Sequence, residues 1–294
     1  MITFYIFRFF EALLFTLPAK AQETLFIGIA KILFLFDTKH KKIIKANLDL
    51  TLKNEISKEK YNTILNYCHK NLILVLLQVL RSNRMSLEEL KETVSFENKA
   101  YVDEAIVQNK KIIFISAHYG NWELGGISLG GLISPATVIY KKMNNTYFDN
   151  YLMRSRTKFN LSMTEKRGAI KQLVKALKKG ESISMLIDQN VNPKDGIVVD
   201  FLGQKATQTA AAAFLARKFD ALIIPLLINT KPGNDKVVTF YEPITTAKTD
   251  NEEKDIQESA QAQADVLSKA IQAHPEPWFW CHKRWKSTHE EIYK

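Results

Sequence analysis

Short apolar runs that alternate with helical patterns constrain the fold of this 294-residue chain most strongly. Such runs occur at 112–115, 136–140, 183–187, 197–201, 221–228 and 236–241. Helical patterns lie between most of them, over 146–159, 168–179 and 207–218, and another covers 252–273. Buried parallel strands read as short continuous apolar runs, and strands alternating with helices form a sheet covered by those helices. We therefore predict an α/β fold with a central, mostly parallel sheet flanked by helices.

The first 36 residues are rich in large apolar side chains, interrupted by Arg8, Glu11 and Lys31. No uninterrupted apolar run reaches the length of about 18 residues that a spanning helix needs, and each charge at mid-membrane costs about 2.5–3.5 kcal/mol. The abundance of aromatic residues is typical of helices that lie in a membrane interface. We expect membrane-associating helices here, and the alternative is that they pack on the main domain.

The composition change near residue 38 suggests two parts. We assign 1–38 to apolar N-terminal membrane-anchoring helices and 39–294 to the main domain. Further helices are predicted ahead of the first strand, and they cover 40–53, 57–81, 86–91 and 97–109.

The chain is basic, with 41 Lys+Arg against 31 Asp+Glu and a formal charge of +10. Lys39–Lys45 follows the apolar helices and suits anionic lipid head groups. Arg154–Lys179 forms a second basic band in which Glu165 is the lone acidic residue. Such a band is either a solvated helix face or a surface for phosphorylated and acidic partners. No helix-turn-helix, zinc-finger or ribonucleoprotein motif supports a nucleic-acid partner.

Neither the cysteines nor the histidines show metal-ligand spacing. Cys68 lies in an apolar helical pattern and Cys281 in an aromatic cluster, so we expect two buried free thiols. Trp278, Trp280 and Trp285 are interpreted as core residues rather than as the lining of a binding groove. We expect neither a metal nor a cofactor.

The segment Ser116–Gly126 carries the chemistry, because it follows the predicted strand 112–115. Ligands in open α/β sheets bind beyond the carboxyl ends of strands, where His118 is placed. If Glu123 lies in the first turn of the next helix, its carboxylate can contact the imidazole, hold one tautomer and stabilise the imidazolium. The alternative is a buried histidine that is hydrogen-bonded at a strand end.

The His-x4-Glu spacing after a strand resembles that of glycerolipid-type acyltransferases, where the acid is usually Asp. Surrounding motifs resemble those of the bacterial lipid A late acyltransferases, the lauroyl/myristoyl transferase family, over most of the chain. These motifs are Ala46–Leu48, Ala117–Glu123, Tyr140–Lys142 through Phe159, Lys175–Glu181, Asp188–Asn190, Phe201–Gly203, Ala216–Arg217 and Pro275–Lys286.

This resemblance implies an enzyme at the cytoplasmic face of the inner membrane. Such an enzyme moves an acyl chain from acyl carrier protein to a hydroxyl of a 3-hydroxyacyl chain on a phosphorylated lipid A precursor. It implies His118 as general base and Glu123 as the carboxylate that orients it. It further implies substrate-binding roles for Arg167, Asp188 and Arg284, although the family commonly has two arginines where this chain has Lys283-Arg284.

Two other functions stay open at this point. The first keeps the chemistry but transfers the acyl group from acyl-CoA to a lysophospholipid or another glycolipid. The second is a basic, non-enzymatic membrane-binding protein, which explains the charge but not the placement of His118 and Glu123.

Overall fold

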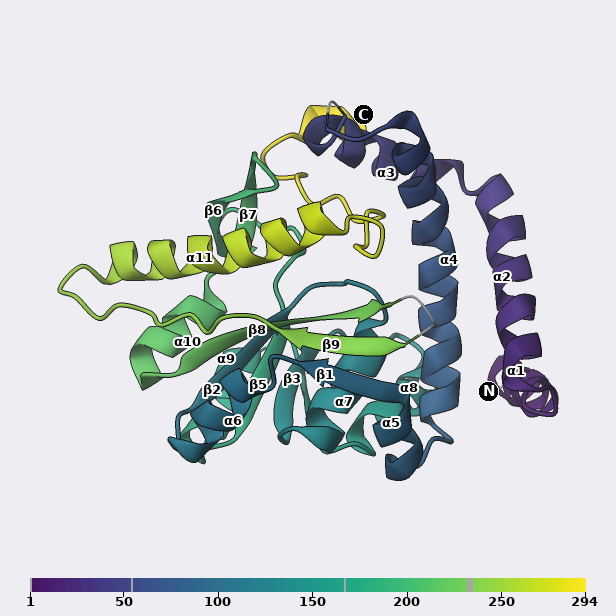
Figure 1. The fold of residues 1–294 in the computed structure, drawn as a ribbon, viewed down its shortest axis with the longest axis horizontal. Helices are drawn as coiled ribbons and strands as arrows, with labels where there is room; N and C mark the ends of the chain where they lie inside the picture. Colours follow the sequence, from purple (N-terminus) through teal and green to yellow (C-terminus); the bar gives the residue numbers. More distant parts are fainter. Residues whose placement is uncertain (1, 54, 167, 232–234) are drawn as a thin grey trace.

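The fold centres on a seven-stranded sheet in a computed structural model that describes residues 2–53, 55–166, 168–231 and 235–294 (Figure 1). In spatial order its strands are β1 (Val94–Glu97), β9 (Lys236–Phe240), β8 (Leu222–Thr230), β2 (Ile112–Ser116), β5 (Ser182–Leu186), β3 (Ala136–Tyr140) and β4 (Leu161–Glu165). Neighbouring strands run parallel except for the antiparallel pair β8 and β9. The predicted α/β class is confirmed.

The two faces of the sheet bury two separate apolar cores. Ile113 and Ile115 of β2 contribute to one core, with α9 (Ala169–Lys178), α10 (Ala211–Phe219) and α11 (Glu252–Ala273). Ile112 and Phe114 contribute to the other, with α5 (Leu87–Thr93), α6 (Ala100–Val107) and α7 (Trp122–Leu132). Burial on both faces explains why β2 is apolar at each of these four positions, since successive side chains of a strand point to opposite faces.

Three strands escape the sequence prediction, and each is short or polar. β1 and β4 are edge strands, and β4 mixes buried and exposed residues instead of forming an apolar run. β7 (Gln204–Thr209) has the polar sequence QKATQT, and the prediction wrongly placed the start of a helix at 207 within it. β6 (Gly196–Phe201) pairs with β7 as a separate antiparallel hairpin rather than joining the main sheet.

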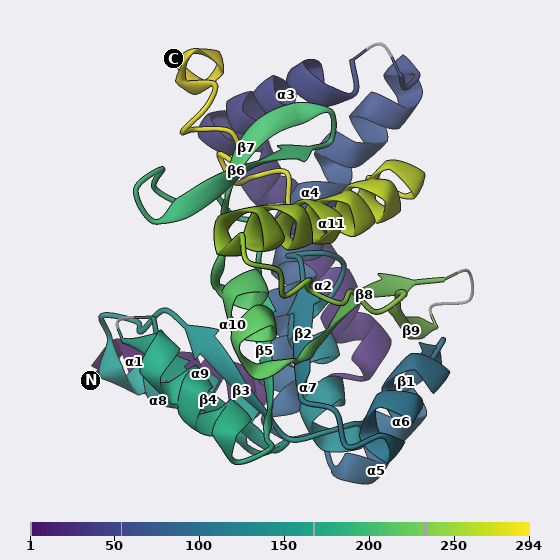
Figure 2. The ribbon, with the colours of Figure 1, turned by 90° about the vertical axis from the view of Figure 1, so that its left-hand side faces the viewer.

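Of the helices that precede the sheet in sequence, α2 (Ala19–Phe36) and α4 (Lys58–Ser82) stand upright beside it, and α3 (Thr38–Thr51) lies across their upper end (Figure 1), as the turned view also shows for α3 (Figure 2). α1 (Ile2–Leu14) and α2 lead to α3, so the predicted division at residue 38 falls at the start of α3. α2 lies along α4. Within the described residues α4 has the length and hydropathy to cross a membrane, with 39% of its apolar window buried. Core helices of soluble proteins share these properties, so α4 alone does not establish a span.

α1 and α2 each have two apolar sides, one packed against the protein and one exposed. Leu14 of α1 and Ala30 of α2 are buried against the rest of the protein. The opposite sides carry large apolar residues that are 59–79% exposed, namely Ile2, Tyr5, Phe9, Phe10, Ile32, Leu35 and Phe36. The two interpretations of this segment therefore coexist, because the helices pack on the domain and also present an apolar surface of the kind that marks an interaction site.

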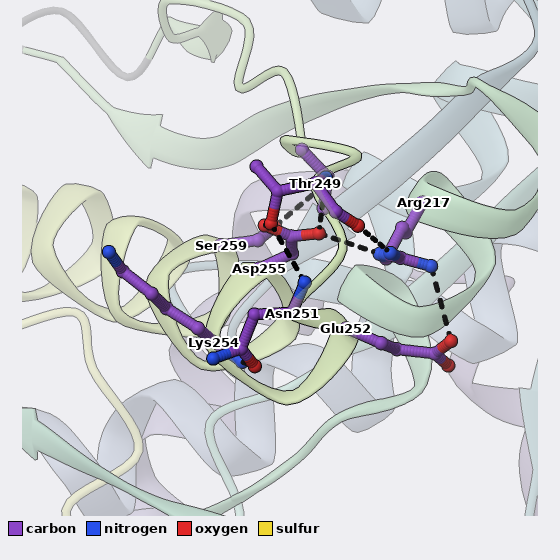
Figure 3. A network of polar contacts seen from close by, with 8 residues as sticks. Arg217, Thr249, Asn251, Glu252, Lys254, Asp255 and Ser259 are labelled. Atoms are coloured by element: carbon purple, nitrogen blue, oxygen red, sulfur yellow. Dashed lines mark hydrogen bonds and ion pairs between the residues drawn. The ribbon is translucent and has the colours of Figure 1, made fainter.

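A polar network fixes the start of α11 to α10 (Figure 3). Arg217 of α10 donates to Asp255 at 2.8 Å, to Glu252 at 3.1 Å and to the Thr249 carbonyl at 2.6 Å. The Asp255 carboxylate also accepts from the backbone and hydroxyl of Thr249. Since Asp255 is 2% exposed, these donors supply the partners that a buried carboxylate requires.

The segment 274–289 threads back between the sheet and the N-terminal helices. Asn47 of α3 donates to the carbonyls of Trp280 and His282, both at 2.8 Å. The backbone of Gly120 donates to Pro277 O, and that of Phe279 donates to His118 O, both at 2.9 Å. As predicted, the core includes Trp278, Trp280 and Trp285. The two cysteines, Cys68 and Cys281, are buried and free, as predicted.

Candidate active site

His118 and Asp188 come from adjacent parallel strands. In the pairing of β2 with β5, Ser116 lies opposite Leu186, and the Ile187 N–H continues the ladder to Ser116 O at 3.0 Å. His118 and Asp188 each follow two residues later, so both side chains emerge at the carboxyl edge of the sheet. This edge is where α/β folds bind their ligands.

The Asp188 carboxylate holds the His118 imidazole. Its Oδ1 lies 2.8 Å from His118 Nδ1, while its Oδ2 accepts from the His118 backbone N–H and from Trp278 Nε1, both at 2.9 Å. Asp188 is 3% exposed, so the acid is fully engaged inside the protein. A carboxylate at Nδ1 keeps the proton on that nitrogen and leaves Nε2 free to accept one.

His118 and Asp188 shift each other's pKa in opposite directions. Burial alone would lower the pKa of His118, but the charge and hydrogen bond of Asp188 outweigh burial and raise it. Burial alone would raise the pKa of Asp188, but the charge and hydrogen bonds of His118 lower it to about 2. Asp188 is therefore ionised at neutral pH, and its charge stabilises a protonated His118.

Glu123 does not make the contact with His118 that the sequence suggested. It lies in the first turn of α7 and accepts two hydrogen bonds from Arg156 of α8 (Thr146–Thr157), from Nε at 2.9 Å and from Nη2 at 2.6 Å. The planar guanidinium fork matches a carboxylate in this bidentate geometry, which accounts for the orientation. The charge of Glu123 still raises the pKa of His118, and that of Arg156 lowers it.

The loop after β5 presents two amides to the site. Gln189 Nε2 lies 3.3 Å from His118 Nε2, the nitrogen that Asp188 leaves free. The Asn190 backbone N–H donates to His282 Nε2 at 3.0 Å, and the Asn190 side chain bonds to Ser287. Burial lowers the pKa of His282 to about 4, so this imidazole is neutral and suited to accept.

Arg284 is placed behind this loop rather than in the cavity. It is fully buried, and its Nη1 donates to the carbonyls of Thr207 and Gln189. Its guanidinium carbon lies 4.7 Å from the ring centre of Phe201. Burial lowers the pKa of Arg284 to about 10, which leaves it charged at neutral pH. A side chain in this position supports the Gln189 backbone.

A cavity of about 690 Å³ opens beside His118. Its polar lining comes from Glu123, Lys141, Arg156, Lys166 and Gln189, and the exposed side chains of Lys141, Lys166 and Gln189 mark its mouth. Its apolar lining comes from α7 and from the strands, including Gly126, Leu129, Val138, Met163 and Met185. A polar mouth over an apolar interior matches an amphipathic ligand with a reactive head and a hydrocarbon tail.

Three of the five site residues predicted from the sequence lie at the cavity, one is buried away from it, and one lies outside the described residues. His118 and Glu123 line the cavity, and Asp188 contacts His118 from behind. Arg284 is buried away from the lining, and Arg167 lies outside the described residues. In the part of the chain that the structure describes, no cluster of three or more His, Cys, Asp or Glu could hold a metal. Sequence reasoning assigned no role to Arg156 or Gln189, although Arg156 stood in the basic band and Gln189 beside Asp188.

Known proteins match this chain over about two thirds of its length or more, and a family profile matches nearly all of it. A family profile described as bacterial lipid A biosynthesis acyltransferase matches residues 1–287. A lipid A biosynthesis lauroyltransferase of Escherichia coli K12 is 24% identical over 284 residues, covering 94% of this chain and 89% of that protein. A lipid A biosynthesis palmitoleoyltransferase of the same organism is 22% identical over 253 residues, covering 86% of this chain and 80% of that protein. A Haemophilus influenzae lipid A biosynthesis acyltransferase is 23% identical over 195 residues, covering 66% of this chain and 60% of that protein.

Proposed function

This chain belongs to the bacterial lipid A biosynthesis acyltransferase family, and on that basis we propose that it transfers a fatty acyl chain from acyl carrier protein to a hydroxyl of a 3-hydroxyacyl chain on a phosphorylated lipid A precursor. The observation that carries the proposal is the His118–Asp188 pair at the mouth of the apolar cavity. The pair supplies a base with a fixed tautomer, and the cavity offers room for a hydrocarbon chain.

In the proposed reaction His118 Nε2 removes the proton of the acceptor hydroxyl while the hydroxyl oxygen attacks the thioester carbonyl. The carbonyl oxygen becomes an oxyanion in the tetrahedral intermediate. When the intermediate collapses, the carbon–sulfur bond breaks, the ester remains on the lipid, and the imidazolium returns its proton to the thiolate of the carrier. Asp188 keeps the imidazole oriented and stabilises its charged form.

Two further side chains take roles in this mechanism. Gln189 Nε2 lies next to the reacting nitrogen, where its N–H groups can donate to the oxyanion. Glu123 stabilises the imidazolium through its charge, and the Arg156 fork keeps that carboxylate fixed. We assign Arg284 to positioning the Gln189 backbone rather than to direct contact with substrate.

The basic residues at the cavity mouth suit the phosphates of the acceptor and the acidic surface of the carrier. Lys141 and Lys166 line the mouth, and Lys171, Lys175 and Lys178 are exposed along α9. Arg167 remains our candidate for a directed phosphate contact, which the resemblance implies. Opposite charges speed the encounter of two partners and fix their register.

We place the enzyme at the cytoplasmic face of the inner membrane. The support is the exposed apolar side of α1 and α2, followed by the basic cluster Lys39–Lys45. Apolar side chains enter the lipid boundary, and lysines contact anionic head groups. This arrangement brings a membrane-held acceptor to the cavity mouth.

The direct test incubates the purified chain with acyl carrier protein thioesters of graded length and a tetra-acylated, diphosphorylated acceptor. The product is detected by mass spectrometry as a gain of one acyl chain. A parallel arm supplies acyl-CoA with a lysophospholipid. Transfer only in the second arm would replace the lipid A acceptor with a phospholipid, and transfer in neither would reject the enzyme assignment.

A further inference from the structure

Glu11 is a buried carboxylate in a helix that is otherwise mostly apolar. It is 3% exposed, although α1 presents large exposed apolar residues on its other side. The hydroxyl of Tyr151, on α8, donates to Glu11 Oε1 at 2.6 Å. Arg8 of α1 and Arg84, just beyond α4, bring their guanidinium nitrogens to 2.5 and 3.9 Å from the same carboxylate. Burying a charge is costly unless it is paired, so these contacts indicate a specific docking site for α1.

An aromatic cluster surrounds this carboxylate and joins the same two helices. The ring of Phe7 lies 5.2 Å from both Phe148 and Tyr151, edge to face. The ring of Phe4 lies 5.5 Å from Phe148. Edge-to-face packing at these distances is directional, so it fixes the angle of α1 against α8 as well as burying surface.

α8 carries both the docking contacts and the site contacts. Phe148 and Tyr151 are three residues apart and face α1. Leu152 and Arg156 are four residues apart and line the cavity, where Arg156 holds Glu123. Phe148 and Leu152 are themselves four residues apart, so the side chains that face α1 and those that line the cavity adjoin on the helix surface. α8 is therefore a rigid element between α1 and the catalytic cavity.

We propose that Glu11 and Tyr151 are positioning residues for the transfer reaction. Their contact fixes α8 so that Arg156 holds Glu123 beside His118. α1 then belongs to the scaffold of the site and is more than a detachable anchor. This inference rests on the proposed function, and it adds a role for the N-terminal helix inside the chemistry.

The test removes one hydroxyl with Tyr151→Phe and compares it with Tyr147→Phe on the same helix. Tyr147 is 43% exposed, and its hydroxyl has no hydrogen-bond partner among the described residues. Both variants are assayed in detergent micelles, where membrane attachment does not limit the rate. We expect Tyr151→Phe to lower kcat about three- to tenfold with little change in KM, and Tyr147→Phe to match the unaltered enzyme. Wild-type kcat in Tyr151→Phe would overturn the proposal.

A double-mutant cycle separates positioning from general destabilisation. If the contact acts through Arg156, Tyr151→Phe should cost much less in an Arg156→Lys background than in the natural one. Equal fold-losses in both backgrounds would mean that Tyr151 acts independently of Arg156, and the proposal would then be wrong.

Hydrogen exchange provides a readout that does not need turnover. Tyr151→Phe and Glu11→Gln should speed amide exchange in the last turn of α8 and at residues 122–124, whereas Tyr147→Phe should not. Unchanged exchange in both variants would contradict the coupling. If the unaltered protein transfers no acyl chain, the proposed function fails, and this measurement still decides the structural coupling.

Discussion

His118 and Asp188 lie 70 residues apart in the sequence and occupy equivalent positions beyond paired strands. The register that sets Ser116 opposite Leu186 brings their side chains into hydrogen-bonding distance. The pair thus depends on the order of the sheet, in which β5 inserts between β2 and β3. A base and its orienting carboxylate that lie two residues beyond paired central strands are held more firmly than they would be in the middle of long loops.

Replacing the base should abolish most of the transfer. His118→Ala is expected to lower kcat by about 10²–10⁴-fold, the usual contribution of a positioned base. His289→Ala, far along the C-terminal segment, is the matched control and should retain the natural rate. The measurement is single-turnover acyl transfer, with circular dichroism to check folding. A folded His118→Ala enzyme with more than a tenth of the natural rate would contradict the assignment.

The pH profile should depend on Asp188. The base must be neutral to act, and Asp188 raises the pKa of His118, so the acid limb of kcat/KM should have its midpoint above the ordinary histidine value of about 6.5. In Asp188→Asn the favourable charge is gone and burial remains, so the midpoint should move to lower pH while the rate falls. An acid limb that stays in place in this variant would argue against the pair.

The Glu123–Arg156 fork should affect rate more than binding. Glu123→Gln removes a charge that favours the imidazolium, so kcat should fall at least tenfold with little change in KM. Glu181→Gln makes the same change at an exposed ion pair with Lys179, 3.7 Å apart, and should have little effect. A rise in KM with unchanged kcat in Glu123→Gln would instead indicate a substrate-binding role.

Gln189 should stabilise the transition state by donating a hydrogen bond to the oxyanion. Removing one oxyanion donor typically lowers kcat by about 10²–10³-fold, and Gln189→Ala should approach that range if its amide is the principal donor. Gln172→Ala, an exposed glutamine of α9, serves as the control. The comparison uses kcat for the same thioester in both variants. A natural kcat in Gln189→Ala would move the oxyanion role to backbone N–H groups.

The depth of the apolar cavity should select acyl length. Gly126 lines the cavity, and a Cβ built there meets no atom within 4 Å, so a larger side chain would project into open space. Gly126→Leu should disfavour the longest thioester that the natural enzyme uses by about tenfold relative to shorter ones, measured by competition between two donors. Gly28→Leu on α2, also in open space, is the control and should keep the natural preference.

The sequence predicted where strands and helices lie along the chain better than it predicted which of them lie next to one another in space. The apolar run 112–115 located His118 at a strand end, and 183–187 did the same for Asp188. The order of strands in a sheet depends on crossovers that local sequence patterns do not encode. The sequence therefore predicted Glu123, the nearest acid along the chain, as the partner of His118 in place of Asp188. Nothing in the sequence distinguished Arg156 from the other basic residues of its band. Its partner, Glu123, lies on another helix, and only the tertiary structure brings the two together. β4 was missed because a half-exposed edge strand lacks an apolar run.

The contacts of residues 277–284 have a consequence for the order of folding. This segment bonds to Gly120 and to the His118 carbonyl, and its Trp278 holds Asp188. Residues 277–284 follow every strand of the seven-stranded sheet in the sequence, so the nascent chain can assemble that sheet before the site is complete. Newly made protein should therefore become active in a late step, and chains cut before residue 275, which also lose the core side chains Trp278, Trp280 and Trp285, should lack transfer activity.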